Sequence, residues 1–252
     1  MILKNTRVKQ IKQIKQLQRL CVKLSLILFF TSLSSVSLLQ KTWGKSCDMA
    51  LVDWSSEFQC ITKLKADEDF RKIPYKSNDI TSTMDRIQAK INKLPSSCQK
   101  ELPSEYTLSP LLALSKYKSH AVLVSNISEI IPNLQAAMKS NGCDSIDTLF
   151  IIGHGDSGCV SVGAGIECDS KAEISTTNIN NWEKSFKSLN GNVKQIQIVA
   201  CHSGQGEKGE KLVAEMARIV GASTVAPVKE VRSDQDIMKL SNRERVSSTP
   251  KK

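Results

Sequence analysis

The sequence predicts an α/β protein with a mostly parallel sheet flanked by helices, preceded by a small helical subdomain. From His120 onward, short apolar runs alternate with segments of helical periodicity. The helical segments are followed by glycine, at Gly142, Gly191 and Gly221, which is a common helix stop. Regular alternation of strands and helices favours a parallel sheet that is covered on both faces.

Composition divides the chain into four segments. Residues 1–46 resemble an export signal or membrane anchor, and residues 47–118 form the helical N-terminal subdomain. Residues 119–228 carry the strand–helix alternation. Residues 229–252 are polar and charged with no sustained apolar period, so we expect a disordered tail.

The leader places nine basic residues and no acid in residues 1–46, with an apolar run over residues 24–39. A basic stretch followed by an apolar one is the layout of an export signal. A free-standing transmembrane helix needs about 20 apolar residues, more than this run offers. A cleaved signal and an uncleaved membrane tether through residues 24–39 both stay open. Either predicts a periplasmic, cell-surface or secreted protein.

The net charge of +10 comes from this leader, because ten minus its nine cations leaves +1 for the remaining residues. A nucleic-acid-binding domain carries a basic face. The sequence therefore predicts no nucleic-acid partner.

Cysteine usage agrees with export. Of eight cysteines, Cys21 lies in the leader, which leaves an odd number and therefore a free thiol. If Cys201 is that thiol, six cysteines remain for three disulfides. Cys159 and Cys168 flank a hairpin-like segment and are the first pair we expect. The alternative is a reducing compartment in which the thiols are buried.

The elements follow from local periodicity. In the helical subdomain, Ile80, Met84, Ile87 and Ile91 recur at helical spacing after a cap at Asn78 or Asp79. In the α/β domain we expect strands at 121–124, 149–152, 196–200 and 222–228, a glycine-rich hairpin around 159–168, and helices at 128–140, 178–189 and 207–220.

Two of these strands end in a reactive side chain followed by glycine. The strings are Ile151-Ile152-Gly153-His154-Gly155 and Ala200-Cys201-His202-Ser203-Gly204. Chemistry in open parallel sheets gathers at the carboxyl ends of strands. A cysteine and a histidine placed there form a nucleophile with its proton-transfer partner.

Together these strings resemble the caspase-like (clan CD) cysteine peptidases, which include caspases, metacaspases, legumain, clostripain and gingipain relatives. The Cys-His-Ser-Gly string is most similar to metacaspases. The wider pattern, with Trp182 on the intervening helix, is similar to a bacterial caspase-like domain of large secreted surface proteins. The resemblance covers residues 119–228, and the 47 residues from His154 to Cys201 hold one hairpin and one helix.

The resemblance implies a caspase-like sandwich that hydrolyses a peptide or protein substrate through an acyl-enzyme. Cys201 would be the nucleophile and His154 the general acid/base, and the N–H groups of Gly155 and Cys201 would form the oxyanion hole. It implies no metal and no cofactor. Many relatives carry an acid just before the cysteine, where this chain has Val199-Ala200, so the preferred substrate residue stays open. Asp156 is either a pocket acid or a solvated turn residue.

Other interpretations compete with this one. A non-catalytic exported module could use the same cleft to bind a peptide or glycan, or serve as structure. Gly204-x-Gly206-x-x-Gly209 follows a strand and opens a helix, as a nucleotide-binding loop does. Gly155-Asp156-Ser157-Gly158 imitates a serine-peptidase string, but the α/β pattern does not suit a two-barrel fold. Zinc binding by Cys201, His202 and His154 is a further alternative. The sequence has no Cys-x-x-Cys or His-x-x-x-His pair with the spacing of a structural zinc site.

Overall fold

The computed structural model describes residues 44–53, 64, 67–76, 79–101, 108–162, 173–231 and 245–250. Residues 1–43 of the leader, residues 163–168 of the expected hairpin and most of the tail lie outside these residues. Within the described ranges, no helix combines the length and apolar character needed to span a bilayer.

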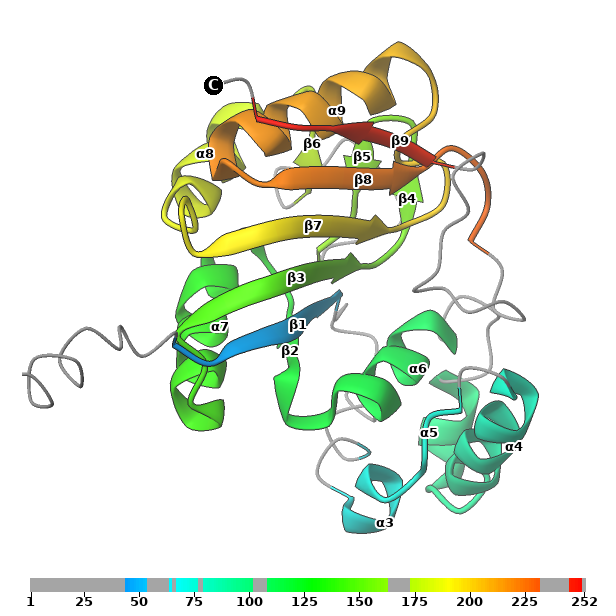
Figure 1. Ribbon diagram of the computed structural model, residues 1–252. Coiled ribbons are helices and arrows are strands. Elements are labelled where there is room, and N and C mark those ends of the chain that lie inside the picture. Colours follow the sequence, from blue (N-terminus) through cyan, green and yellow to red (C-terminus); the bar gives the residue numbers. More distant parts are fainter. Residues whose placement is uncertain are drawn as a thin grey trace, which may run out of the picture. The chain divides into compact units, whose positions relative to one another are not determined.

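A six-stranded sheet lies at the centre, in the order β2-β1-β3-β7-β8-β9 (Figure 1). Its strands are parallel except β9, which runs antiparallel to β8. This confirms the prediction of an α/β protein with a mostly parallel sheet. The strands are β1 (Ser46–Asp53), β2 (Ala121–Val124), β3 (Ser145–Ile152), β7 (Val193–Val199), β8 (Ser223–Pro227) and β9 (Arg245–Ser248).

Helices cover both faces because the central strands are apolar on both. Along β3, Leu149 and Ile151 join a core with α7, α8 and α9, whereas Phe150 and Ile152 join a second core with α4 and α6. Successive side chains of a strand point to opposite faces, so one strand supplies both cores. The helices are α3 (Glu68–Arg71), α4 (Ile80–Ile91), α5 (Ser96–Glu101), α6 (Leu108–Tyr117), α7 (Ile127–Asn141), α8 (Ile179–Lys187) and α9 (Gly206–Val220), with a 3₁₀ turn η3 (Lys118–His120).

The helix ends have identifiable local causes. Asp79 caps α4, where its carboxylate accepts a hydrogen bond from the Ser82 N–H at 3.1 Å. Gly142 after α7 and Gly221 after α9 have φ values of 65° and 69°, a left-handed conformation that glycine adopts without a steric penalty. These helices lie within a few residues of their predicted bounds.

A small antiparallel sheet branches from the end of β3. It contains β4 (Gly155–Asp156), β5 (Cys159–Val160) and β6 (Ile174–Ser175). The indole Nε1 of the fully buried Trp182 donates a hydrogen bond to the Ser175 carbonyl at 2.9 Å, which ties this sheet to α8. This hydrogen bond fixes the small sheet next to the end of β3.

The predicted boundary between a helical subdomain at 47–118 and an α/β domain at 119–228 differs from the structure. Residues 46–53 form β1, which lies inside the main sheet between β2 and β3. Helices α4 and α6 share a core with this sheet, and residues 45–252 form one compact unit. The helices of this segment thus form a layer on one face of the sheet. β1 can take a central position because it carries apolar side chains on both faces.

The expected disordered tail also requires correction. Arg245–Ser248 pairs with β8 as the antiparallel edge strand β9, with Val246 opposite Ala226. Val246 packs against the core beneath α9. The segment was not recognisable as a strand because Arg245 and Ser247 are exposed, as edge positions allow.

A disulfide joins Cys47 at the start of β1 to Cys143 just before β3. Cys98 and Cys159 are disulfide-bonded as well. Cys168, the expected partner of Cys159, lies outside the described residues. Among the described cysteines, Cys201 is the free thiol.

We expect the double variant Cys47→Ser/Cys143→Ser to lose about 2–4 kcal/mol of unfolding free energy, because this disulfide closes a sequence separation of 96 residues. Urea denaturation followed by far-UV circular dichroism measures the loss. Cys201→Ser, which breaks no disulfide, is the control and should stay within about 0.5–1 kcal/mol of the wild type. Equal midpoints for all three proteins would contradict the prediction.

Candidate active site at the carboxyl edge of the sheet

Strand register brings His154 and Cys201 to the same level of the sheet. β3 and β7 are parallel neighbours, and their last paired residues are Ile152 and Val199. The Gly153 N–H then donates to the Val199 carbonyl at 3.3 Å, so the contact between the strands continues one residue further. His154 and Cys201 each come two residues after the last pair. The structure therefore places the two predicted site residues on adjacent strand ends.

Gly155 keeps these two strand ends in contact. A Cβ at position 155 would lie 2.6 Å from the Cβ of Ala200 and 2.8 Å from the Cys201 carbonyl oxygen. Both distances are shorter than van der Waals contact, so no other residue fits without moving the cysteine loop. The glycine after His154 is thus explained by close approach of the two backbones.

Cys201 is a half-buried free thiol at the first turn after β7. His202 follows it with a φ of 56°, in the left-handed region that non-glycine residues seldom occupy. Residues held in this region often lie at functional sites, where the surrounding structure imposes the conformation. Within the described residues the N–H of Cys201 has no hydrogen-bond acceptor. A backbone donor is therefore available beside the sulfur.

The last residue of β8 and the residues after it, 227–231, run along the cysteine loop and hold it in place. The Gly204 N–H donates to the Pro227 carbonyl at 2.7 Å, and the His202 N–H donates to the Lys229 carbonyl at 3.1 Å. At the end of this run, the Val231 N–H donates to the Cys201 Sγ at 3.3 Å. Backbone contacts from β8 thus define where the sulfur lies.

Two glycines after Cys201 allow the cysteine loop to pack closely against α9. A Cβ at Gly209 would lie 2.1 Å from the Gly204 carbonyl carbon, and a Cβ at Gly204 would lie 2.6 Å from a methyl group of Val246. The added atoms would meet the protein's own backbone and a β9 side chain, whereas a Cβ at Gly206 would meet no atom within 4 Å. This packing explains both glycines without the nucleotide that the sequence alternative required.

His154 lies half-buried after β3, and burial lowers the pKa of its imidazole below the usual 6.5. Desolvation has this effect because it disfavours the charged imidazolium. At neutral pH the ring is therefore mainly in its neutral form. A neutral imidazole is able to accept a proton from a neighbouring thiol.

Asp53 is an acidic residue at this edge that the sequence analysis missed. It ends β1, its side chain is 7% exposed, and its Oδ2 would lie 3.5 Å from a Cβ on Gly153. The segment Met49-Ala50-Leu51-Val52-Asp53 has the same design as the two site strings, an apolar run that ends in a reactive side chain. That pattern was a usable signal, but residues 47–118 were interpreted as helical.

The remaining sequence candidates have structural explanations. Asp156 is exposed, and its Oδ1 accepts a hydrogen bond from the Ser157 N–H at 2.7 Å, as in a turn. The Ser157 hydroxyl donates to the Gln205 carbonyl at 2.6 Å, which links the hairpin to the loop before α9. Neither arrangement resembles a serine nucleophile with its base.

Comparison with known proteins identifies the family of the α/β region. A family model described as a domain of unknown function, DUF4347, matches residues 107–235. The chain belongs to the DUF4347 family. The DUF4347 match includes both His154 and Cys201 but not β1, which supplies a central strand of the same sheet. No curated protein and no solved structure matches the chain.

We expect the His154 imidazole to titrate below pH 6.5 in the folded protein. The unfolded chain then binds this proton first as the pH falls, so unfolding free energy decreases below about pH 6.5 and does not depend on this group above it. The chain has three histidines, so NMR of the ring protons can follow each one, with His154→Gln assigning the signal. A His154 midpoint at or above 6.5 would refute the burial argument.

We expect Gly209→Ala to destabilise the protein by about 1–3 kcal/mol, because the added methyl group meets the Gly204 backbone rather than a movable side chain. The same variant should change the alkylation rate of Cys201, since Gly204 belongs to the cysteine loop. Glu210→Ala, an exposed neighbour on α9, is the matched control. An unchanged midpoint in Gly209→Ala would show that the helix and the loop are not tightly packed.

Proposed function

We propose that this DUF4347 chain is a cysteine peptidase with a caspase-like fold, exported from the cell and acting on peptide or protein substrates. The observation that carries the proposal is the shared level of Cys201 and His154 on the parallel neighbours β3 and β7. The free state of the Cys201 thiol and the lowered pKa of His154 support it. A histidine about 50 residues before the cysteine is also the arrangement seen in caspases.

In the proposed reaction, His154 accepts and donates a proton in both the acylation and the deacylation step. Neutral His154 accepts the thiol proton of Cys201, and the resulting thiolate attacks the carbonyl carbon of the scissile peptide bond. The N–H groups of Gly155 and Cys201 would stabilise the oxyanion that develops. His154 then protonates the leaving amine, which gives a thioester on Cys201. A water molecule, activated by His154, hydrolyses the thioester and restores the thiol.

The backbone around the sulfur suits this role in two respects. The N–H of Cys201 has no acceptor within the described residues, which an oxyanion-hole donor requires. The sulfur is held by the Val231 N–H instead of being packed in an apolar core. A free cysteine without a chemical role is more often packed as a small apolar residue in a core.

Alkylation kinetics test whether Cys201 and His154 act together. Iodoacetamide reacts with thiolate, so Cys201 should be labelled near neutral pH, and His154→Ala should slow the labelling. His120→Ala is the matched control, because His120 precedes β2 and lies at the amino edge of the sheet. Equal labelling rates in the two variants would remove the evidence for a Cys-His pair.

A positional peptide-library digest tests hydrolysis itself. We expect the full chain to cleave a defined subset of peptides, and Cys201→Ala to reduce cleavage to background. The preferred residue before the cut would identify the pocket that the sequence left open. If the wild type and Cys201→Ala give identical digests, the domain is a non-catalytic binding or structural module.

A further inference from the structure

Cys47, His120 and Cys143 form a second cluster of reactive side chains, at the opposite edge of the sheet. Cys47 is the second residue of β1, His120 directly precedes β2 and Cys143 lies two residues before β3. In the sheet, β1 is the parallel neighbour of both β2 and β3. One ligand atom from each residue lies within 4.8 Å of the other two. The members of the cluster come from three distant segments, so their spacing in the sequence does not indicate a metal site.

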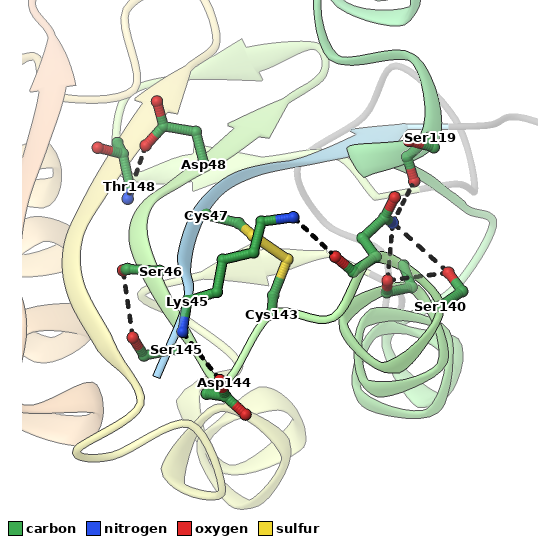
Figure 2. Close-up of a disulfide and its surroundings, with 12 residues drawn as sticks. Lys45, Ser46, Cys47, Asp48, Ser119, Ser140, Cys143, Asp144, Ser145 and Thr148 are labelled. Atoms are coloured by element: carbon green, nitrogen blue, oxygen red, sulfur yellow. Dashed lines mark hydrogen bonds between the residues drawn. A yellow bond between two sulfur atoms is a disulfide. The ribbon is translucent and has the colours of Figure 1, made fainter. Parts of the chain in front are cut away.

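Hydrogen bonds hold these three segments together without help from the disulfide (Figure 2). Lys45 and Asp144 exchange two of them: the Asp144 N–H donates to the Lys45 carbonyl at 2.8 Å, and the Lys45 N–H donates to the Asp144 carboxylate at 2.9 Å. The Asn141 amide donates to the Ser119 carbonyl at 3.0 Å, which ties η3 to the end of α7. The cluster thus has a scaffold of hydrogen bonds that do not involve the S–S bond.

Pairing within the sheet adds to this scaffold. Cys47 pairs with Ile146 in the β1–β3 ladder, and the Ser145 hydroxyl donates to the Ser46 hydroxyl at 3.1 Å. Cys143 is fixed by its own N–H, which donates to the Met138 carbonyl at 2.9 Å. Both cysteines are 7% exposed. Reduction would therefore leave two thiols side by side in a largely dry position.

We propose that reduction of the Cys47–Cys143 disulfide converts this cluster into a Zn²⁺ site with two thiolates and the His120 imidazole as ligands. Zinc accepts three protein ligands of this kind with a water molecule in the fourth position. Ligand atoms around tetrahedral zinc are about 3.5–4 Å apart, so the two sulfur atoms must separate after reduction, while the ligand nitrogen of His120 already lies within 4.8 Å of both. The disulfide and the metal exclude each other, so the site reports the redox state of its surroundings.

A dithiol can act as the reductant of the Cys47–Cys143 disulfide. The dithiol is oxidised to its disulfide while the Cys47–Cys143 bond breaks and two thiols form. Zinc binding then releases the two thiol protons and forms two Zn–S bonds and one Zn–N bond. Two thiolates neutralise the charge of the ion, so no further acidic ligand is needed. The site does not depend on the proposed peptidase, because Cys201 and His154 lie at the other edge of the sheet.

Cobalt(II) titration of the reduced full chain under nitrogen tests the proposal. We expect one Co²⁺ per chain, with the visible absorption bands of tetrahedral cobalt and the near-ultraviolet band of a thiolate ligand. Zn²⁺ should displace Co²⁺ and should raise the melting temperature of the reduced protein but not of the oxidised one. Oxidised protein that binds cobalt in the same way would overturn the proposal.

Variants locate the site. His120→Ala and Cys143→Ser should abolish the tetrahedral spectrum, whereas Cys201→Ser and His202→Ala should retain it. His120→Ala keeps the disulfide when oxidised, so circular dichroism of that form establishes that the variant folds before it is reduced. Zinc should also protect Cys47 and Cys143 from alkylation in peptide maps of the reduced protein. A spectrum that persists in His120→Ala, or that disappears in Cys201→Ser, would place the metal elsewhere and refute the assignment.

Discussion

The parallel pairing of β3 with β7 is the constraint on which the candidate active site depends. Parallel strands end at the same edge of a sheet, and here the register makes Ile152 and Val199 the last pair. The residues two positions later, His154 and Cys201, are therefore neighbours although 47 positions separate them in the chain. A shift of one residue in this register would place them at different levels and turn the apolar side chains of one strand to the wrong face.

Close packing then limits how the chain can leave these two strands. Gly155 lets one backbone pass directly against Ala200 and Cys201, and Gly204 and Gly209 let the cysteine loop lie against α9. The run from Pro227 to Val231 also holds the cysteine loop, through backbone hydrogen bonds and one contact to the sulfur of Cys201. The position of the thiol is thus determined mainly by backbone geometry. This explains why short glycine-containing strings were enough to indicate the candidate site in the sequence.

Much of this arrangement could be predicted from the sequence. Helical periodicity and glycine stops located α4, α7, α8 and α9, and apolar runs located β2, β3, β7 and β8, because these signals are local. β1 was missed since its partners lie about 70 to 100 residues away and a short apolar run does not distinguish a strand from a helix. β9 was missed because an edge strand needs few apolar residues. The Cys47–Cys143 pair was beyond prediction, since cysteine spacing alone does not determine connectivity.

The bond between Cys47 and Cys143 also bears on what limited proteolysis of this protein would yield. It joins β1 to Cys143, two residues before β3, and every helix from α3 to α7 lies between the two cysteines. A single backbone cut in that interval would leave two fragments that remain covalently connected and separate only under reducing conditions. Strand β1 would keep its place between β2 and β3, so a nicked molecule could retain its folded sheet.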